Sequence, residues 1–249
     1  MQRIVNLSGG KDSTAMLLLM IEKGERIDRV INVDMGVEFP EIQKHIEKLR
    51  EYIKPLNLET YKIDFKYYLA RAPVEVGNEI RFCGLGWPRW KARWCTGIKI
   101  ATLQYAAMGG KNPEKIISNR RPDIRILPHV GIAADEKRKT LQHIRYPLIE
   151  WGVTSETALK ICYERGFTFD GYYEQFRRSS CFCCPFTGSA ELYKIYLNRP
   201  EIWMKIRNLD KIAHNNFTRK RSLSNIEMIF AGGGNIPRVD RYKSFLYVV

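Results

Sequence analysis

The stretch Arg3-Ile4-Val5-Asn6-Leu7-Ser8-Gly9-Gly10-Lys11-Asp12-Ser13 decides the fold of this 249-residue chain. Residues 3–7 are largely apolar and predict a short buried strand, and residues 14–23, which end before a glycine, predict a helix. The two glycines between them let the backbone curl closely around a ligand, and the start of a helix attracts negative charge. We therefore expect an anion-binding loop between the first strand and the first helix.

Strand and helix patterns alternate after this loop. A helix is expected at Pro40–Tyr52, where proline suits the first turn and the apolar residues share one face. Another helix is expected at Gly97–Met108. Strands are expected at Asp28–Val33, Glu59–Ile63, Lys115–Ser118 and His129–Ile132. This alternation predicts an α/β fold with an open parallel sheet and helices on both faces.

The pattern becomes mainly helical after Pro147. Helices are predicted at Thr154–Arg165, near Ser189–Leu197 and near Pro200–Asn215, and the glycine-rich residues 232–237 suggest a loose tail. We therefore predict a nucleotide-binding α/β domain over residues 1–150. A helical C-terminal region over residues 151–249 would pack on it.

Composition narrows the function classes. The net charge of +14 suits an anionic partner such as a nucleic acid, although a basic protein with a small anionic substrate would show it too. No apolar run is long enough for a membrane span, and the N-terminus has no signal-peptide pattern, so we expect a cytoplasmic protein without a membrane partner. In a reducing compartment the six cysteines would serve metal binding or redox chemistry rather than disulfides.

The loop offers several groups to a phosphate. Lys11 brings a full positive charge, and Ser8 and Ser13 bring hydroxyls, of which Ser13 could also cap the helix. Asp12 could orient Lys11 or help to hold Mg²⁺. The pattern is not a Walker loop, which is longer and ends in Gly-Lys-Ser/Thr. The competing interpretation is an ordinary turn rich in glycine and serine.

These residues resemble those of a known family. The segment Ser8–Ser13, SGGKDS, resembles the loop of the PP-loop ATP pyrophosphatases, the adenine-nucleotide α-hydrolase-like proteins. Three further segments resemble motifs of the phosphoadenosine phosphosulfate (PAPS) reductase family within that group. They are DMGVEFPE at residues 34–41, RWCT at residues 93–96 with Lys99, and GIAADEKR at residues 131–138.

The resemblance implies a nucleotide site at the C-terminal edge of the sheet, with ATP or another adenine nucleotide and Mg²⁺ as cofactors. Gly9 and Gly10 would line the phosphates, and Asp34 and Asp135 would position the nucleotide or its metal. The alternative for both acids is a structural carboxylate at a strand end. Lys99, Lys137 and Arg138 are candidate anion clamps, although a single surface cation is more often simply solvated.

The cysteines suggest a metal centre. Two thiolates in Cys181-x-x-Cys184 can bind one metal from a tight turn, and the family motif adds Cys95, with Cys83 as a fourth candidate. The resemblance implies a [4Fe–4S] cluster. Structural zinc and unligated thiols remain alternatives, and Cys183 leaves the ligand set open. Cys162, inside a predicted helix, is expected in the core.

The resemblance also bears on the reaction. Assimilatory reductases of the family use a cysteine near the C-terminus, whereas the last cysteine of this sequence is Cys184, and their first loop is degenerate, whereas this one is complete. We therefore expect ATP cleavage to AMP and pyrophosphate, which activates an acceptor for sulfur transfer from a donor protein. Reduction of PAPS or adenosine phosphosulfate is the nearest alternative. A nucleic-acid-binding module with a vestigial pocket and a relative of the small ATP sulfurylase subunit are two others.

A nucleic-acid acceptor, tRNA or DNA, would suit the basic charge. The stretch Arg81–Trp94 interleaves cations with Trp87, Trp90 and Trp94, and cations hold phosphates while indoles stack on bases. An equally open interpretation is a loop whose tryptophans are structural.

Overall fold

The computed structural model describes residues 1–110, 126–137, 140–179 and 181–233. The described residues form two compact units. Unit 1 comprises residues 1–63, 97–110, 126–137 and 140–179, and unit 2 comprises residues 64–96 and 181–233. The division differs from a boundary at residue 150, because the helices that follow this residue are shared between the two units.

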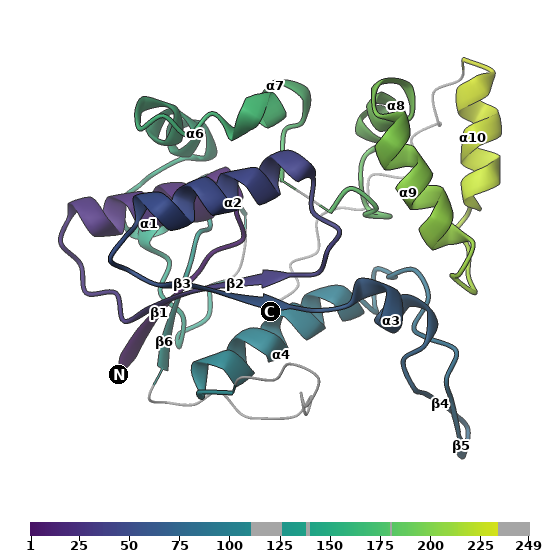
Figure 1. Ribbon diagram of the computed structural model, residues 1–249, viewed down its shortest axis with the longest axis horizontal. Coiled ribbons are helices and arrows are strands. Elements are labelled where there is room, and N and C mark those ends of the chain that lie inside the picture. Colours follow the sequence, from purple (N-terminus) through teal and green to yellow (C-terminus); the bar gives the residue numbers. More distant parts are fainter. Residues whose placement is uncertain (111–125, 138–139, 180, 234–249) are drawn as a thin grey trace. The chain divides into compact units, whose positions relative to one another are not determined.

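Unit 1 is built on a parallel sheet, as predicted. Its strands are β1 (Gln2–Asn6), β2 (Arg29–Asp34), β3 (Leu58–Lys62) and β6 (Ile126–Val130), in the order β3-β2-β1-β6 (Figure 1). All three neighbouring pairs are parallel. The strand predicted at residues 115–118 lies outside the described residues. Since the strands run in one direction, their C-terminal ends meet at one edge, where ligands bind in open α/β sheets.

Helices cover both faces of this sheet (Figure 1). The helices α1 (Lys11–Glu22) and α2 (Pro40–Tyr52) lie on one face, and α4 (Trp94–Ala107) covers the other. Beneath α4, the side chains of Ile4 and Ile31 pack with Ala106 in a buried cluster. Unit 1 also contains α5 (Pro147–Glu150), α6 (Ser155–Glu164), which packs on α1, η2 (Phe169–Gly171) and α7 (Tyr172–Gln175).

The helix ends test several predictions. The bounds of α2 agree with the sequence pattern, and the Thr154 hydroxyl accepts the Thr157 N–H at the start of α6, as a cap should. Helix α1 begins at Lys11, three residues before the predicted start. Ser13 is therefore not its cap, because it lies inside the first turn, and Gly10 occupies the cap position without a side-chain bond.

Unit 2 is mainly helical. It contains α3 (Phe65–Ala70), α8 (Ser189–Asn198), α9 (Pro200–Asp210), α10 (Leu223–Ala231) and a hairpin of β4 (Val74–Val76) and β5 (Glu79–Arg81). Trp87 is completely buried in this unit, where its indole Nε1 donates to Asp210 at 2.7 Å and its ring packs against Phe217. The sequence did not predict α10 or the hairpin. Among the described residues, no helix is both long and apolar enough to traverse a bilayer.

Candidate functional site

The phosphate loop joins the C-terminal end of β1 to the start of α1. Two hydrogen bonds fix Leu7, the residue just before the loop. Its N–H donates to the Ile31 carbonyl at 2.8 Å, and the side-chain amide of the buried Asn32 donates to the Leu7 carbonyl at 2.8 Å. These bonds tie the loop to β2, the neighbouring strand. The loop is therefore anchored at the ligand-binding edge of the sheet.

Two glycines let other elements close on the loop. Gly9 has a φ of +76°, and a Cβ there would lie 2.8 Å from Cδ1 of Ile46 on α2. Gly131 follows β6, and a Cβ there would lie 2.6 Å from Cα and 2.7 Å from N of Ser13. The residue after β6 thus packs directly against the backbone of the loop, which gives the segment beginning at Gly131 a structural role in the site.

The two serines of the loop bond to each other. Their hydroxyl oxygens are 3.0 Å apart, and the Ser8 N–H donates to the Ser13 hydroxyl at 3.2 Å. The Ser13 hydroxyl also donates to the Gly10 carbonyl at 3.0 Å. These bonds make the loop a closed, pre-formed turn.

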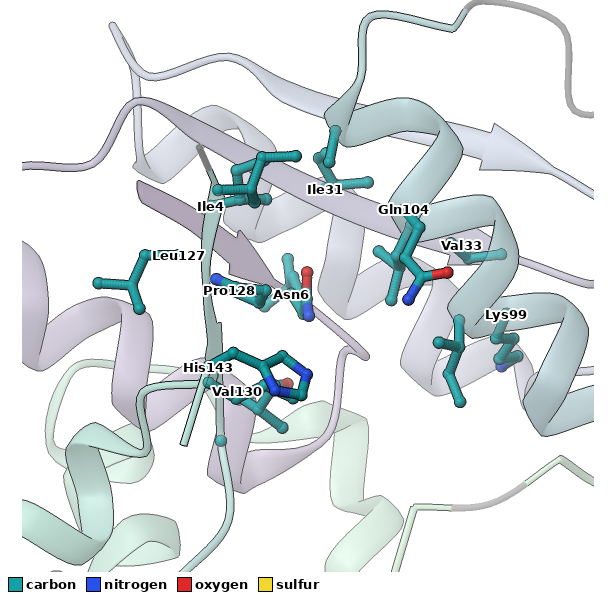
Figure 2. Close-up of a pocket in the computed structure, with 18 of the residues that line it drawn as sticks. Ile4, Asn6, Ile31, Val33, Lys99, Gln104, Leu127, Pro128, Val130 and His143 are labelled. Carbon is teal, nitrogen blue, oxygen red and sulfur yellow. The ribbon is translucent and has the colours of Figure 1, made fainter. Parts of the chain in front are cut away.

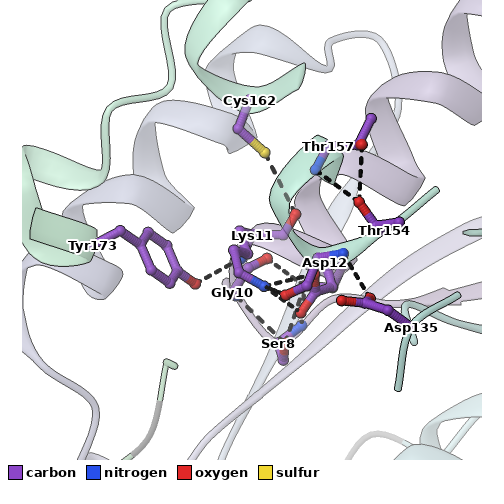
Figure 3. A network of polar contacts seen from close by, with 11 residues as sticks. Ser8, Gly10, Lys11, Asp12, Asp135, Thr154, Thr157, Cys162 and Tyr173 are labelled. Carbon is purple, nitrogen blue, oxygen red and sulfur yellow. Dashed lines mark hydrogen bonds and ion pairs between the residues drawn. The ribbon is translucent and has the colours of Figure 1, made fainter. Parts of the chain in front are cut away.

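Lys11 is buried at the centre of a polar network (Figure 3). Its ammonium donates to both carboxylate oxygens of Asp12, at 2.9 and 3.1 Å, and to the Ser155 hydroxyl. Asp135 accepts the Ser155 N–H at 2.8 Å, at the first residue of α6. Asp12 therefore orients Lys11. The network links Asp135 to the same lysine through Ser155, a residue that the sequence did not single out as part of the site.

The second predicted acid, Asp34, is the last residue of β2. One of its neighbours lowers the pKa of its carboxyl group, and another raises it. Its carboxylate accepts the Gly36 N–H at 2.7 Å, and Glu38 lies beside it. Lys99 from α4 donates to Glu38 at 2.8 Å. Burial and the Glu38 carboxylate raise the pKa of Asp34. Burial acts against ionisation of Glu38 as well, but the Lys99 ammonium outweighs it and lowers the pKa of Glu38.

Glu38 is thus a site residue that sequence reasoning missed, although it lies in the DMGVEFPE segment. Lys99, predicted as an anion clamp, faces this carboxylate. Lys137 is exposed in the segment that carries Asp135, and Arg138 lies outside the described residues.

Replacing Lys99 with methionine should destabilise the protein by about 2 kcal/mol at pH 7, because Glu38 would remain buried without its cation. The lowered pKa of Glu38 means that its ion pair adds stability above the ordinary pKa of 4.5, which is lost as the pH falls through the lowered folded value. The loss should therefore shrink near pH 4, as measured by urea unfolding at both pH values.

A Glu38→Gln/Lys99→Met double variant is the control, and it should recover part of the loss, since glutamine carries no charge. The contribution of Asp34 to stability has the opposite pH dependence. Its raised pKa favours the folded state at low pH, and this contribution disappears as the pH rises through the folded value. An equal effect of Lys99→Met at both pH values would contradict the ion-pair explanation.

The phosphate loop adjoins a cavity of about 470 Å³ between the sheet and α4 (Figure 2). Ser8, Ser13 and Gly131 line its loop end. Its walls are mostly apolar, with a few polar side chains from Asn6, Lys99, Gln104, Gln142 and His143. An apolar slot with a few polar groups is the usual form of a small-molecule site, and this volume lies in the usual range.

All four predicted metal ligands lie in unit 2. Cys181 and Cys184 flank a tight turn in which the Cys184 N–H donates to the Cys181 carbonyl at 3.1 Å. Burial raises the pKa of Cys184, and the Cys95 thiol adds to the effect. Cys83 is exposed. Within the described ranges, no three histidine, cysteine or acidic side chains are grouped so that they could hold a metal ion, and the cluster stays a prediction from the motif.

Cys162 is buried, as predicted, and burial raises the pKa of its thiol to about 12. It is therefore an inert core residue.

The tryptophans of residues 81–94 all make packing contacts within unit 2. Trp87 is buried, and Trp94 donates from its indole Nε1 to Gly86 at 2.9 Å. Trp90 packs with Phe186 around Arg93, whose guanidinium carbon is 4.4 Å from each ring centroid. Trp87 is therefore packed inside unit 2 and does not stack on a base, whereas a stacking role for the half-buried Trp90 and Trp94 stays a prediction.

Comparison with known proteins agrees with this geometry. The phosphoadenosine phosphosulfate reductase domain matches residues 2–156, which include the loop, Asp34 and Asp135. An uncharacterized protein of Methanocaldococcus jannaschii, MJ0066, is 27% identical over 225 residues, which cover 83% of this chain. The chain spans 41% of the length of that relative. With more than half of its length matched, the chain belongs to the phosphoadenosine phosphosulfate reductase domain family.

Proposed function

We propose that this protein is a cytoplasmic enzyme that binds ATP with Mg²⁺ at the phosphate loop and cleaves it between the α- and β-phosphates. AMP would be transferred to an acceptor, and a sulfur donor would then displace it. The observation that carries this proposal is a glycine-lined loop that adjoins a cavity of about 470 Å³. The loop also contains a buried lysine, Lys11. Family membership supports nucleotide-related sulfur chemistry in general.

The cavity supports an adenosine site. Its apolar walls suit the faces of a purine, and Asn6, Gln104 and His143 offer polar groups for the base edge or the ribose. Ser8 and Ser13 line the cavity and belong to the loop, so one ligand could fill both. A nucleoside with a phosphate chain has the matching shape.

The chemistry follows from where charge develops. An acceptor oxygen attacks the α-phosphorus, the bond from that phosphorus to the bridging oxygen breaks, and pyrophosphate leaves with the electron pair. In this proposal, the loop N–H groups and Lys11 would stabilise the charge on this leaving group, together with Mg²⁺. In the second step, the donor sulfur bonds to the activated acceptor atom, and AMP leaves with the acceptor oxygen.

No step of this proposal uses a metal cluster. A [4Fe–4S] centre or zinc at Cys83, Cys95, Cys181 and Cys184 stays a prediction from the motif, because the described thiols do not form a group of three. Iron, sulfide and zinc analysis of anaerobically purified protein tests it directly.

A nucleic acid is the acceptor class that the charge distribution supports. The described residues of unit 2 contain 14 lysines and arginines but only 7 aspartates and glutamates, so a net +7 of the chain's +14 lies in this unit. The hairpin of β4 and β5 is followed by Phe82, whose side chain is 74% exposed, and Ile80 on β5 is 64% exposed. Exposed rings beside cations are the means by which proteins hold single strands.

Replacing Phe82 with alanine should weaken the binding of a single-stranded oligonucleotide about tenfold, since one base loses its stacking partner. Fluorescence anisotropy with labelled RNA and DNA at several salt concentrations measures this. The affinity should fall steeply with salt, because the phosphates are held by cations. Met228→Ala, which removes another exposed apolar side chain of unit 2, is the matched control and should leave the affinity unchanged. Salt-independent binding would exclude this role for the surface.

The decisive test is product analysis. ATP labelled in the α- and γ-phosphates is incubated with the protein, Mg²⁺ and candidate acceptors, and the proposal expects pyrophosphate and acceptor-bound AMP in equal amounts, with free AMP released once a sulfur donor is added. Release of ADP or orthophosphate instead would refute the proposed cleavage. Sulfite release from PAPS would assign the protein to the reductases, and tight nucleic-acid binding without nucleotide turnover would assign it to binding modules.

A further inference from the structure

Tyr173 of α7 reaches into the phosphate loop (Figure 3). Its hydroxyl oxygen accepts the backbone N–H of Lys11 at 2.7 Å. Lys11 is the first residue of α1, and the amides of a first turn have no acceptor within their own helix. Such amides are the groups that bind a phosphate oxygen. An oxygen of the protein therefore lies where a bound nucleotide would place one of its own.

A second hydroxyl lies against the same part of the loop. A Cβ on Gly10 would be 2.2 Å from the Ser179 hydroxyl oxygen and 3.5 Å from that of Tyr173. The Tyr173 and Ser179 side chains also hydrogen-bond to each other. The bare face of Gly10, which a phosphate must approach, is thus covered by two neutral hydroxyl groups.

The tyrosine is held in place by packing. Its ring contacts Phe169 and Tyr172 edge to face, with centroids 4.8 and 5.3 Å away. Burial raises the pKa of Tyr173 to about 12, so its hydroxyl stays protonated at neutral pH. The Tyr173 hydroxyl is therefore neutral when it accepts the backbone N–H of Lys11. A pyrophosphate oxygen carries negative charge, and such acceptors form the stronger hydrogen bond.

We propose that the Tyr173 hydroxyl occupies a phosphate-oxygen position of the loop in the nucleotide-free protein and leaves this position when the nucleotide binds. This inference rests on the proposed function, because it takes the same loop as the nucleotide site. Tyr173 would keep the Lys11 amide satisfied without a ligand. Each binding event must then break this bond, which lowers the affinity of the loop for its ligand.

Tyr173→Phe removes the oxygen and keeps the ring. We expect this variant to bind MgATP and pyrophosphate about fivefold more tightly than the wild-type protein in calorimetric titrations, the ratio that corresponds to one net hydrogen bond. The backbone amide resonance of Lys11 should also shift in the nucleotide-free ¹⁵N spectrum. Tyr172→Phe is the matched control, since its hydroxyl donates to the Arg178 carbonyl at 2.9 Å in the same segment.

Equal or weaker ligand binding by Tyr173→Phe, in a protein with an unchanged thermal midpoint, would overturn the proposal, as would an unshifted Lys11 resonance. Failure of the proposed function and failure of the Tyr173 displacement are distinguishable. Absence of nucleotide and pyrophosphate binding in all three proteins, with the Lys11 resonance shifted, would refute the proposed function and the displacement with it. Binding of unchanged affinity would refute the displacement alone.

Discussion

Replacing Lys11 with methionine is expected to lower kcat/KM for pyrophosphate release from ATP by about 10²–10³-fold, the usual effect of removing one charge-stabilising group. The lysine is only 7% exposed, and Asp12 and Ser155 hold its ammonium. A charge fixed in this way needs little reorganisation as the leaving group develops its own charge. Steady-state measurement of pyrophosphate release with α-labelled ATP checks the result.

Lys160→Met is the control for this variant. Lys160 belongs to the same unit but is 76% exposed, and its ammonium is 3.8 Å from Glu164. Its replacement should leave kcat/KM unchanged. Circular dichroism and thermal unfolding should show that Lys11→Met remains folded, although Asp12 loses its partner. A folded Lys11→Met protein with a kcat/KM close to the wild-type value would remove Lys11 from the reaction.

Replacing Gly131 with alanine is expected to lower kcat/KM by about 10²-fold, because a displacement of about 1 Å in a site can have this effect. The added Cβ would lie 2.6 Å from Cα of Ser13 and 2.8 Å from the carbonyl carbon of Asp12. Both are backbone atoms, so no side-chain rotation can relieve the clash, and the loop and the end of β6 must separate. Calorimetric titration with MgATP and pyrophosphate-release kinetics measure the effect.

Gly97→Ala is the matched control for Gly131→Ala. Among the described residues, apart from its chain neighbours and the backbone of its own helix, no heavy atom lies within 4 Å of the position where its Cβ would be, and Gly97 is inside helix α4. Alanine is a better helix former than glycine, so this variant should be at least as stable as the wild type. If Gly131→Ala bound MgATP with wild-type affinity, the close approach of β6 to the loop would not matter for the site.

The local structure of the loop could be predicted from the sequence because short-range sterics decide it. The strand β1, the turn through Gly9 and the helix α1 follow from an apolar run, adjacent glycines and a helical pattern within about twenty residues. The same holds for α2, whose proline and apolar face defined its bounds. The family motifs pointed to Asp34 and Asp135, and the structure places both at polar clusters beside the expected edge.

The residues that contact the loop from distant parts of the sequence were missed, because short-range sterics do not decide such contacts. Tyr173 contacts Lys11 across 162 positions and Ser155 contacts it across 144, and neither belongs to a pattern that marks it as a residue of the phosphate site. Trp87 is an error of the opposite kind, because the sequence suggested a binding role for a residue that is packed in the core. A basic, aromatic stretch suggested a stacking surface, but Asp210 and Phe217, both far along the chain, bury this indole. Composition cannot tell an exposed ring from a packed one.

The sequence by itself determined a glycine-rich phosphate loop with a lysine, the parallel α/β frame around it and the family motifs. These features depend on backbone sterics and on residue types that act within one turn or one strand. Only the tertiary structure decided which groups face the loop: Tyr173 on its first amide, Ser155 on its lysine and Gly131 against its backbone. Such contacts arise from the packing of distant elements, which no local pattern encodes.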